Sequence, residues 1–177
     1  MLRPIGENEI NAAAELTERL FKRPRGRSYP LLSGAGEIAE EYRFRAADAN
    51  SSLLGYYEGD GRLAGVLALF YLPGEGYLQS TAFVAEEGCA AFEAFLLHLK
   101  ENFAGYEANV GVAKENERAI CALTSFGFAL GEASADMRLG RARFAPSTGE
   151  FFPVERVRRE TFDEYAAFHD AHFPDVF

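Results

Sequence analysis

Two apolar runs separated by a glycine-rich turn limit the fold more than any other feature of this chain. They lie in SSLLGYYEGDGRLAGVLALFYL and are joined by Gly59-Asp60-Gly61. Glycine and aspartate accept the positive φ angles of a tight hairpin, so the runs predict antiparallel strands at 52–58 and 63–72. Pro73-Gly74 begins a second turn, and the next apolar segment predicts a third strand at 77–85. Together the three strands form a β-meander.

A strand–helix–strand unit follows the meander. Apolar residues recur at helical spacing from Gly88 to Phe103, and YEANVGVA predicts a strand at 106–113 that pairs with the third strand. Further helices are predicted at 7–21, 36–46 and 117–125, and FALGEASADMRL predicts one or two short final strands. A meander followed by such a crossover predicts an α/β (α+β) fold with a mixed, mainly antiparallel sheet and helices on both faces.

The apolar faces of these helices predict the core. The first helix should bury one face, and the helix after the meander another. Asn116 should cap the helix at 117–125 and Gly127 should end it. The residues expected in the core are Ile10, Ala13, Ala14, Leu16, Leu20, Phe92, Phe95, Leu96, Leu99 and Ile120.

Charge and cysteine content exclude several classes of protein. The formal net charge is −9, which argues against nucleic acid as a partner, because binding it depends on Lys and Arg at the phosphates. Two cysteines, Cys89 and Cys121, cannot build a disulfide framework. The N-terminus lacks the apolar core of a signal peptide, and no stretch is long enough to span a bilayer. We therefore expect a cytoplasmic protein that does not bind membranes.

The segment ENERAICALTSFGF at 115–128, together with the order of elements, resembles the GNAT acyltransferase superfamily. The closest local match is Asn116, Ala119 and Ile120, closing on Phe126-Gly127-Phe128. The resemblance implies a GNAT-like domain at 1–140 that binds acetyl-CoA in a cleft where two neighbouring strands splay apart. It also implies an acyl acceptor, a primary amine of a small molecule or peptide, that enters between the first two helices and the splayed strands.

The resemblance also implies which residues hold the coenzyme. Backbone groups of the third strand would meet the pantetheine amides, and the helix mouth at Gly88 would receive the pyrophosphate. The next helix would border the other side of the coenzyme. The implied cofactor-binding residues are Ala82, Phe83, Val84, Gly88, Cys89, Ala90, Asn116 and Arg118.

The sequence departs from the family pattern at two chemically important places. Gly88 and Ala90 fit the last marks of the family's phosphate loop, but Ala85 stands where a basic or amide side chain is usual. Leu123 stands where many members place a tyrosine as general acid. Glu86 and Glu87 lie beside the helix mouth and would repel a phosphate. We therefore predict the family's geometry with weakened phosphate binding.

Four polar residues are candidates for catalysis, each with an alternative. Glu40 or Glu41 could act through water as a base, or both could be surface residues of the helix. Gln79 and Ser80 interrupt an apolar strand close to the expected cleft. They could contact ligand or water there, because a buried polar group left unpaired costs about 1–3 kcal/mol. Alternatively, one of them faces solvent at the edge of the sheet.

Three other features have a functional and a structural interpretation. Cys89 at a helix start could be a nucleophile or a small packing residue. His169 and His172 could share a metal or lie on a solvated helix. The basic run Lys22, Arg23, Arg25 and Arg27 could meet phosphates or form a solvated turn.

The last part of the chain repeats the plan of its beginning. After a linker at 141–150, the segment 151–177 reads as a strand and then a helix with a capping box at Thr161 and Glu164. We expect either the start of a second GNAT-like unit of a tandem protein or an extension packed on the first unit. The apolar ending Val176-Phe177 favours the tandem. Pairing with such a second unit or as a homodimer is expected.

Two functions follow from the sequence. The first is an acyl-CoA-dependent N-acyltransferase, in which an amine attacks the thioester of acetyl-CoA directly. The alternative is a catalytically degenerate GNAT-shaped module that acts as a scaffold or regulatory half. The features that favour the alternative are Ala85, Glu86, Glu87 and Leu123.

Overall fold

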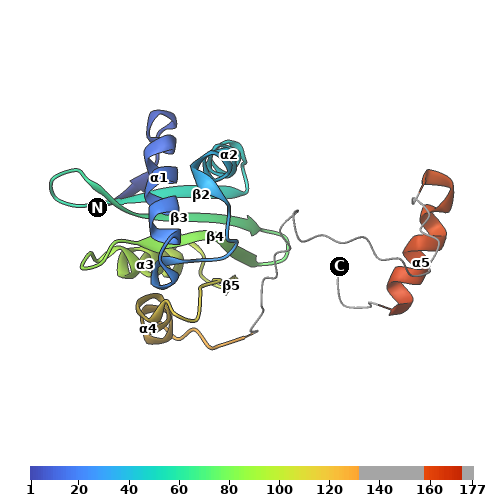
Figure 1. The fold of residues 1–177 in the computed structure, drawn as a ribbon. Coiled ribbons are helices and arrows are strands. Elements are labelled where there is room, and N and C mark those ends of the chain that lie inside the picture. The colour runs from blue at the N-terminus through green and yellow to red at the C-terminus, as the bar shows by residue number, and fades with distance from the viewer. Residues whose placement is uncertain (132–157, 173–177) are drawn as a thin grey trace, which may run out of the picture. The chain divides into compact units, whose positions relative to one another are not determined.

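The computed structural model describes residues 1–131 and 158–172 (Figure 1). The chain divides into two compact units, Met1–Glu132 and Ala133–Phe177. In the second unit the described part is a 3-10 turn, Arg159–Thr161, followed by α5. The helices and strands are β1 (Leu2–Pro4), α1 (Ile10–Phe21), α2 (Gly34–Ala47), β2 (Ser51–Tyr57), β3 (Leu63–Leu72), β4 (Tyr77–Ala85), α3 (Ala91–Asn102), β5 (Glu107–Asn109), α4 (Glu117–Ser125) and α5 (Phe162–His172).

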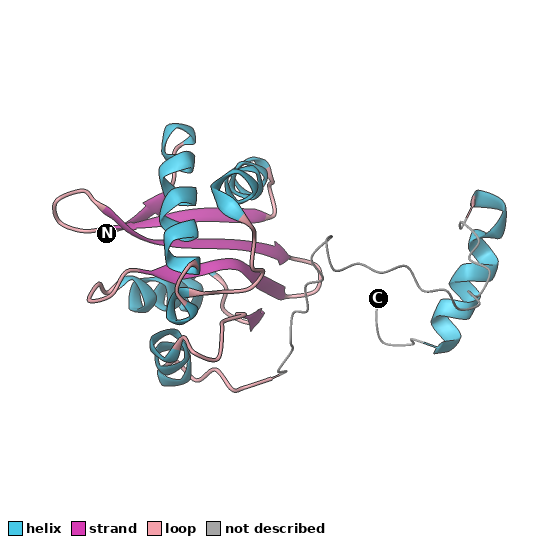
Figure 2. Ribbon diagram, viewed as in Figure 1, coloured by secondary structure: helices cyan, strands magenta, loops and turns pink. Residues whose placement is uncertain are grey.

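The sheet of the first unit follows the chain in the order β1-β2-β3-β4-β5 (Figure 2). Neighbouring strands from β1 to β4 are antiparallel, and β5 runs parallel to β4. The β2–β3 hairpin turns at Gly61, whose φ of +83° is easily reached only by glycine. The predicted meander, its pairing with the following strand and the α/β fold class are confirmed. The strand predicted at 106–113 is shorter in the structure, where β5 covers Glu107–Asn109.

Helices cover both faces of this sheet. α1 and α2 pack on one face over a cluster that includes Ile10, Ile38 and Val66. α3 and α4 pack on the opposite face, where Leu67, Phe83 and neighbouring side chains form a second cluster. Since each helix has one apolar face, the sheet divides the interior into two cores. Figure 1 shows α1 and α2 lying together across the same side of the strands.

The buried face of α3 was predicted correctly. Phe92, Phe95, Leu96 and Leu99 are all buried. The ring of Phe83 stacks on that of Phe92 at 4.8 Å and meets Phe95 edge-on at 5.7 Å. The predicted face of α1 is confirmed as well, with Ile10, Ala13, Ala14, Leu16 and Leu20 buried.

The prediction that Ile120 is a core residue is wrong. α4 packs through Ala119 and Leu123, which lie four residues apart on one narrow stripe and are buried. Ile120 lies beside that stripe and is 38% exposed. The ends of α4 agree with prediction. The Asn116 side chain accepts a hydrogen bond from the N–H of Ala119 at 3.3 Å, and Gly127 follows the helix at φ +91°.

Several predictions concern residues outside the described ranges. The final strands expected at 128–139 fall largely there, as do the linker at 141–150 and most of the strand expected before α5. Within 1–131 and 158–172, no helix has the length and apolar character to cross a bilayer. The same residues contain no group of three or more His, Cys, Asp or Glu side chains arranged to hold a metal.

Candidate functional site

A fork opens in the sheet between β4 and β5. The two strands pair only at Tyr77–Gln79 with Glu107–Asn109, and then separate. From Ser80 onward, the edge of β4 therefore faces a gap between two stretches of backbone. Such a gap leaves N–H and C=O groups without a neighbouring strand, so something else has to bond them.

A short segment of the α1–α2 connection fills this fork. We call residues 27–29 the plug segment. On the β4 side, the Ser28 hydroxyl accepts a hydrogen bond from the backbone N–H of Phe83 at 3.1 Å. On the other side, Ser28 pairs with Val112 as an antiparallel bridge. Ser28 is buried, with 3% of the residue exposed, so the plug segment reaches the interior through this residue.

Backbone hydrogen bonds hold both ends of the plug segment. The N–H of Tyr29 donates to the carbonyl of Gly111 at 2.9 Å, and the N–H of Ala113 donates to the carbonyl of Arg27 at 3.2 Å. The Asn116 amide nitrogen donates to that same Arg27 carbonyl at 3.1 Å. Asn116 therefore caps α4 with its oxygen and holds the plug segment with its nitrogen.

Only one of the three predicted β4 residues directs its N–H into the fork. All three residues lie in register with β3, and the N–H of Phe83 donates to Ser28. Backbone groups alternate between the two sides of an antiparallel strand, so the N–H groups of Ala82 and Val84 point to β3. Phe83 is thus the donor of this set that a ligand in the fork can reach.

Two buried hydroxyls lie where the strands separate. The register between β3 and β4 shifts at this point, since Ala68 pairs with Ala82 and Leu69 with Ser80, which leaves Thr81 as a bulge. The hydroxyls of Ser80 and Thr81 are buried and have no hydrogen-bond partner within the described residues. Leaving buried hydroxyls unpaired is unfavourable, so this place is suited to a polar ligand group or water.

Gln79 lies just before the fork. It pairs with Asn109 of β5, and its side-chain oxygen accepts a hydrogen bond from the Tyr77 hydroxyl at 2.9 Å. Gln79 and Ser80 were predicted together as candidates, but they differ in burial. Ser80 is the buried residue of the two, and Gln79 is half-buried with a partner.

The helix mouth has the open backbone that a phosphate requires. Gly88 has a φ of +81°, and no atom lies within 4 Å of the place a Cβ would take. Ala90 is exposed and caps α3. The Cys89 thiol points back into the protein, donating to the carbonyls of Glu86 at 3.0 Å and Ala64 at 3.7 Å. These contacts favour a structural role for Cys89 over a nucleophilic one.

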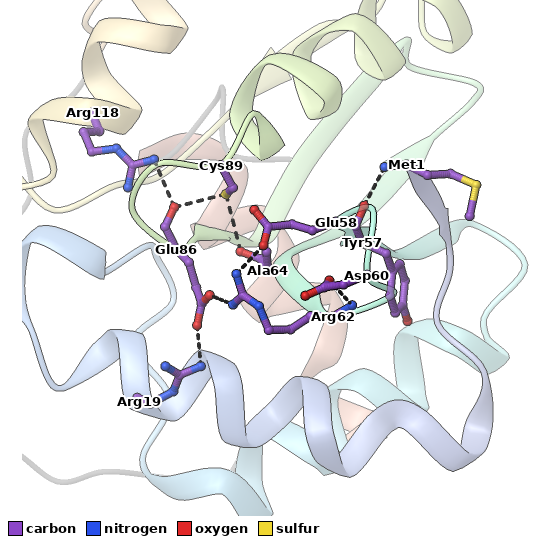
Figure 3. Close-up of polar contacts among 10 residues, drawn as sticks. All are labelled: Met1, Arg19, Tyr57, Glu58, Asp60, Arg62, Ala64, Glu86, Cys89 and Arg118. Carbon is purple, nitrogen blue, oxygen red and sulfur yellow. Dashed lines mark hydrogen bonds and ion pairs between the residues drawn. The ribbon is translucent and has the colours of Figure 1, made fainter.

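The carboxylate of Glu86 is turned away from the mouth and is neutralised. It forms an ion pair with Arg19 of α1 at 2.6 Å and another with Arg62 of the β2–β3 hairpin (Figure 3). Its partial burial acts to raise the carboxyl pKa, but hydrogen bonds from Arg62 and Arg19 outweigh burial and lower the pKa below its ordinary value. The expected repulsion of a phosphate by Glu86 is therefore largely offset by two guanidinium groups.

A cavity of about 440 Å³ lies at this end of the fork, between α1, the connection after it, the end of β4 and the start of α4. Arg118 of α4 donates to the backbone carbonyl of Glu86 at 3.0 Å, and its guanidinium lies over the Phe92 ring. The cavity is lined by cationic and anionic side chains in equal number, Arg19, Arg23, Arg25 and Arg118 with Glu86, Glu87, Glu115 and Glu117.

The remaining candidates lie elsewhere. Glu41 is ion-paired with Arg45 at 2.6 Å, and Glu40 is exposed on the same helix, α2. α2 packs on α1, β2 and β3. Leu123 lies on the buried side of α4 and is part of the core. Of the basic run, Arg23 and Arg25 line the cavity, Lys22 pairs with Glu18, and Arg27 donates to the Phe21 carbonyl.

The sequence matches no family model and no curated protein sequence. Solved structures do resemble it. The spermidine N-acetyltransferase of Vibrio cholerae, in complex with CoA and spermine, gives a TM-score of 0.57 at 14% identity, covering 75% of this chain and 82% of that one. An acetyltransferase of Trypanosoma brucei gives 0.54 at 16% identity, covering 78% of this chain and 99% of that one. The chain has the GNAT fold.

A further GNAT-fold structure shows the same likeness. The aminoglycoside antibiotic 6'-N-acetyltransferase of Acinetobacter baumannii gives a TM-score of 0.50 at 18% identity, covering 79% of this chain and 97% of that one. The plug segment of this chain is held by contacts through Ser28, Gly111 and Asn116.

Sequence reasoning missed three residues of the site. Ser28 and Thr81 carry no local signal, because their roles depend on the fork and on a strand bulge. Arg19 lies on the exposed side of α1 and meets Glu86, which is 67 positions away. Thr81 could be recognised only from the register between β3 and β4, which makes it a bulge.

Proposed function

We propose that this protein is an acyl-CoA-dependent N-acyltransferase that transfers an acetyl group from acetyl-CoA to a primary amine. The observation that carries the proposal is the β4–β5 fork, with the buried hydroxyls of Ser80 and Thr81 where the strands part and, at the end of β4, a cavity lined by four arginines and four glutamates. The solved structures with the same fold include enzymes named for acetylating spermidine and an aminoglycoside. An amine is therefore the acceptor class that we propose here.

The phosphate end of the site fits an acyl-CoA. The open backbone at Gly88 and Ala90 offers N–H donors at the start of α3. Arg118 lies on the side of α4, with Arg23 and Arg25 across the cavity. Guanidinium groups bind phosphate oxygens in a forked geometry, so they can supply the countercharge that Ala85 cannot.

The acyl end fits in part. The Phe83 N–H is the β4 donor that can bond a ligand along the fork, and in this structure Ser28 accepts it. The hydroxyls of Ser80 and Thr81 are placed to bond a polar group where the strands part. We propose that these hydroxyls and the neighbouring Gln79 position the acyl group or the amine.

The chemistry is direct transfer. The amine nitrogen attacks the thioester carbonyl carbon, a C–N bond forms, the C–S bond breaks, and CoA leaves as a thiolate. The nitrogen loses one proton to water, and the thiolate takes up a proton from solvent. Leu123 has no proton to give, but a thiolate is a good leaving group and positioning supplies much of the acceleration.

The alternative, a degenerate module, is favoured by one observation. The backbone donor at Phe83 already has an internal partner, so the fork is filled without a ligand. A protein that never binds acyl-CoA would have the same structure. The two functions differ in a measurable property, the affinity of the chain for acetyl-CoA.

Calorimetric titration with acetyl-CoA tests the proposal, followed by detection of released CoA thiol with spermidine and other primary amines. We expect saturable binding and amine-dependent thiol release. Arg118→Ala should weaken binding about tenfold, since a charge-assisted contact to phosphate is lost. Arg43→Ala is the matched control, because Arg43 is an exposed arginine of α2 outside the cavity. Absence of binding by the wild-type chain and by the control would favour the degenerate module.

A further inference from the structure

The contacts of the plug segment are divided unequally between the two sides of the fork. It bonds β4 through one hydrogen bond, from the Phe83 N–H to Ser28. It bonds the opposite side through Tyr29 to Gly111, Ala113 to Arg27 and Asn116 to Arg27. The plug segment is therefore paired as a strand with 111–113, and its hydrogen bond to β4 is made by a side chain.

We propose that the plug segment is an autoinhibitory strap, which closes the acyl-CoA site until it leaves the fork. This inference rests on the proposed function, since it assigns the regulation of the same site. A ligand in the fork and the Ser28 hydroxyl compete for one donor, the Phe83 N–H, so they cannot both be bonded to it. The apparent affinity for acyl-CoA is lowered by the fraction of molecules in which the strap is closed.

The neighbours of the strap allow it to open without unfolding the sheet. It lies in the connection between α1 and α2, and Tyr29 next to the buried Ser28 is 46% exposed. Leaving the fork breaks the bond from the Phe83 N–H and the backbone bonds to Gly111 and Ala113, and a ligand amide or carbonyl in the fork can restore a partner for Phe83. The β3–β4 pairing, which includes Ala82 and Val84, is not disturbed by this movement.

Gly111 provides a way to open the strap by a single substitution. A Cβ at Gly111 would lie 2.6 Å from the Cβ of Tyr29, which is closer than side chains approach. Gly111→Ala therefore pushes Tyr29 away and favours the open form. Gly36→Ala is the matched control, because Gly36 lies on α2 with no atom within 4 Å of the added Cβ.

A disulfide can close the strap reversibly. Ser28 and Val112 face each other as an antiparallel pair. The backbone hydrogen bonds from Tyr29 to Gly111 and from Ala113 to Arg27 flank them, so this is a non-hydrogen-bonded pair. Cα atoms of such pairs lie about 4.5 Å apart, within the range that a disulfide spans. Ser28→Cys with Val112→Cys, in a Cys121→Ser background, can thus be compared with itself in oxidised and reduced forms.

The experiment is titration of acetyl-CoA into these variants, with amide hydrogen exchange at Phe83 as a readout of opening that needs no ligand. We expect Gly111→Ala to lower the apparent Kd about tenfold and to speed exchange at Phe83. Gly36→Ala should match the wild type in both. The oxidised double-cysteine protein should lose binding and regain it when reduced.

Two results would overturn the inference in distinguishable ways. If the oxidised protein binds acetyl-CoA as well as its reduced form, the strap does not control the site, and the proposed function stands. If Gly111→Ala speeds exchange at Phe83 and still binds no acetyl-CoA, the open fork is not an acyl-CoA site. In that case the proposed function fails, and the inference fails with it.

Discussion

The hydroxyl of Ser28 lies 3.1 Å from the backbone nitrogen of Phe83 and accepts its hydrogen bond, across 55 positions of sequence. Both groups are buried. The bond supplies a partner to a strand donor that the parting of β4 and β5 would otherwise leave unpaired. It therefore stabilises the ligand-free fold at the place where a ligand is proposed to bind.

Removing this hydroxyl should destabilise the free protein. Ser28→Ala leaves the Phe83 N–H buried without a partner, so we expect a loss of about 1–3 kcal/mol in the free energy of unfolding. Urea denaturation measures this loss. Ser125→Ala is the control, because the Ser125 hydroxyl bonds the Ala122 carbonyl at an exposed helix end and should matter little. Equal stability of Ser28→Ala and the wild type would mean that Phe83 finds another partner.

The two buried threonines should respond in opposite directions to the same substitution. Thr81 has a buried hydroxyl without a partner, so Thr81→Val should raise the melting temperature. Thr17 shares a 2.6 Å hydrogen bond with the buried Tyr42 hydroxyl, so Thr17→Val should lower it. Scanning calorimetry of both variants tests the sign of each change in melting temperature. We also expect Thr81→Val to reduce amine acetylation, because the proposed site loses a polar group.

Phe95 of α3 should contribute far more to stability than Ile120 of α4, although both were predicted to be core residues. Phe95 is completely buried, and Phe95→Ala should cost about 3–5 kcal/mol in the free energy of unfolding. Ile120 is 38% exposed, so Ile120→Ala should cost much less. Denaturant midpoints and slopes of the two variants give both values. Similar losses would contradict the packing of α4 through Ala119 and Leu123.

The second glutamate of the mouth, unlike the first, should oppose phosphate binding. Glu87 is exposed and lines the cavity, whereas Glu86 is held by Arg19 and Arg62. Glu87→Gln should tighten acetyl-CoA binding by about fivefold, the effect of about 1 kcal/mol of repulsion in water. Added salt should shrink the difference. Glu101→Gln, on an exposed part of α3 outside the cavity, should leave the affinity unchanged.

Acid should destabilise the fold through Glu9. Hydrogen bonds from the Arg3 side chain, then the Gly6 backbone, lower the pKa of this carboxyl to about 2, with a smaller contribution from Tyr57. The folded-state pKa lies below the unfolded value, so the stabilisation is present above about pH 4.5 and is lost as the pH falls towards 2. The melting temperature of Glu9→Gln should fall less than that of the wild type between about pH 4.5 and 2, the range in which the wild type loses this contribution.

Local signals predicted the strands and most of the helices. The glycines of the β2–β3 turn, the capping side chain of Asn116 and the apolar stripe of α3 each act within a few residues, so the sequence reveals them directly. Ile120 was misplaced because helical spacing defines a broad face, while α4 packs by a narrow one. The exposure of Ile120 depends on the neighbours of α4, which the periodicity does not specify.

The site was predictable in outline but not in its chemistry. Gly88 and Asn116 were recognisable from their places at helix starts. The direction of the Glu86 carboxylate depends on two arginines from distant elements, and the closing of the fork depends on Ser28. These are contacts between segments far apart in the chain, and no pattern in the sequence of one segment contains them.

The close approach of Gly111 to Tyr29 gives a marker for comparing this protein with its evolutionary relatives. A residue with a Cβ at position 111 is incompatible with Tyr29 in its present place. A lineage that keeps the fork filled should therefore inherit the glycine at 111 and the hydroxyl at 28 together. A lineage that has replaced the glycine is released from selection for that serine, and its fork is expected to be permanently accessible. Covariation of positions 28 and 111 among homologues would thus indicate which of them regulate the proposed acyl-CoA site in this way.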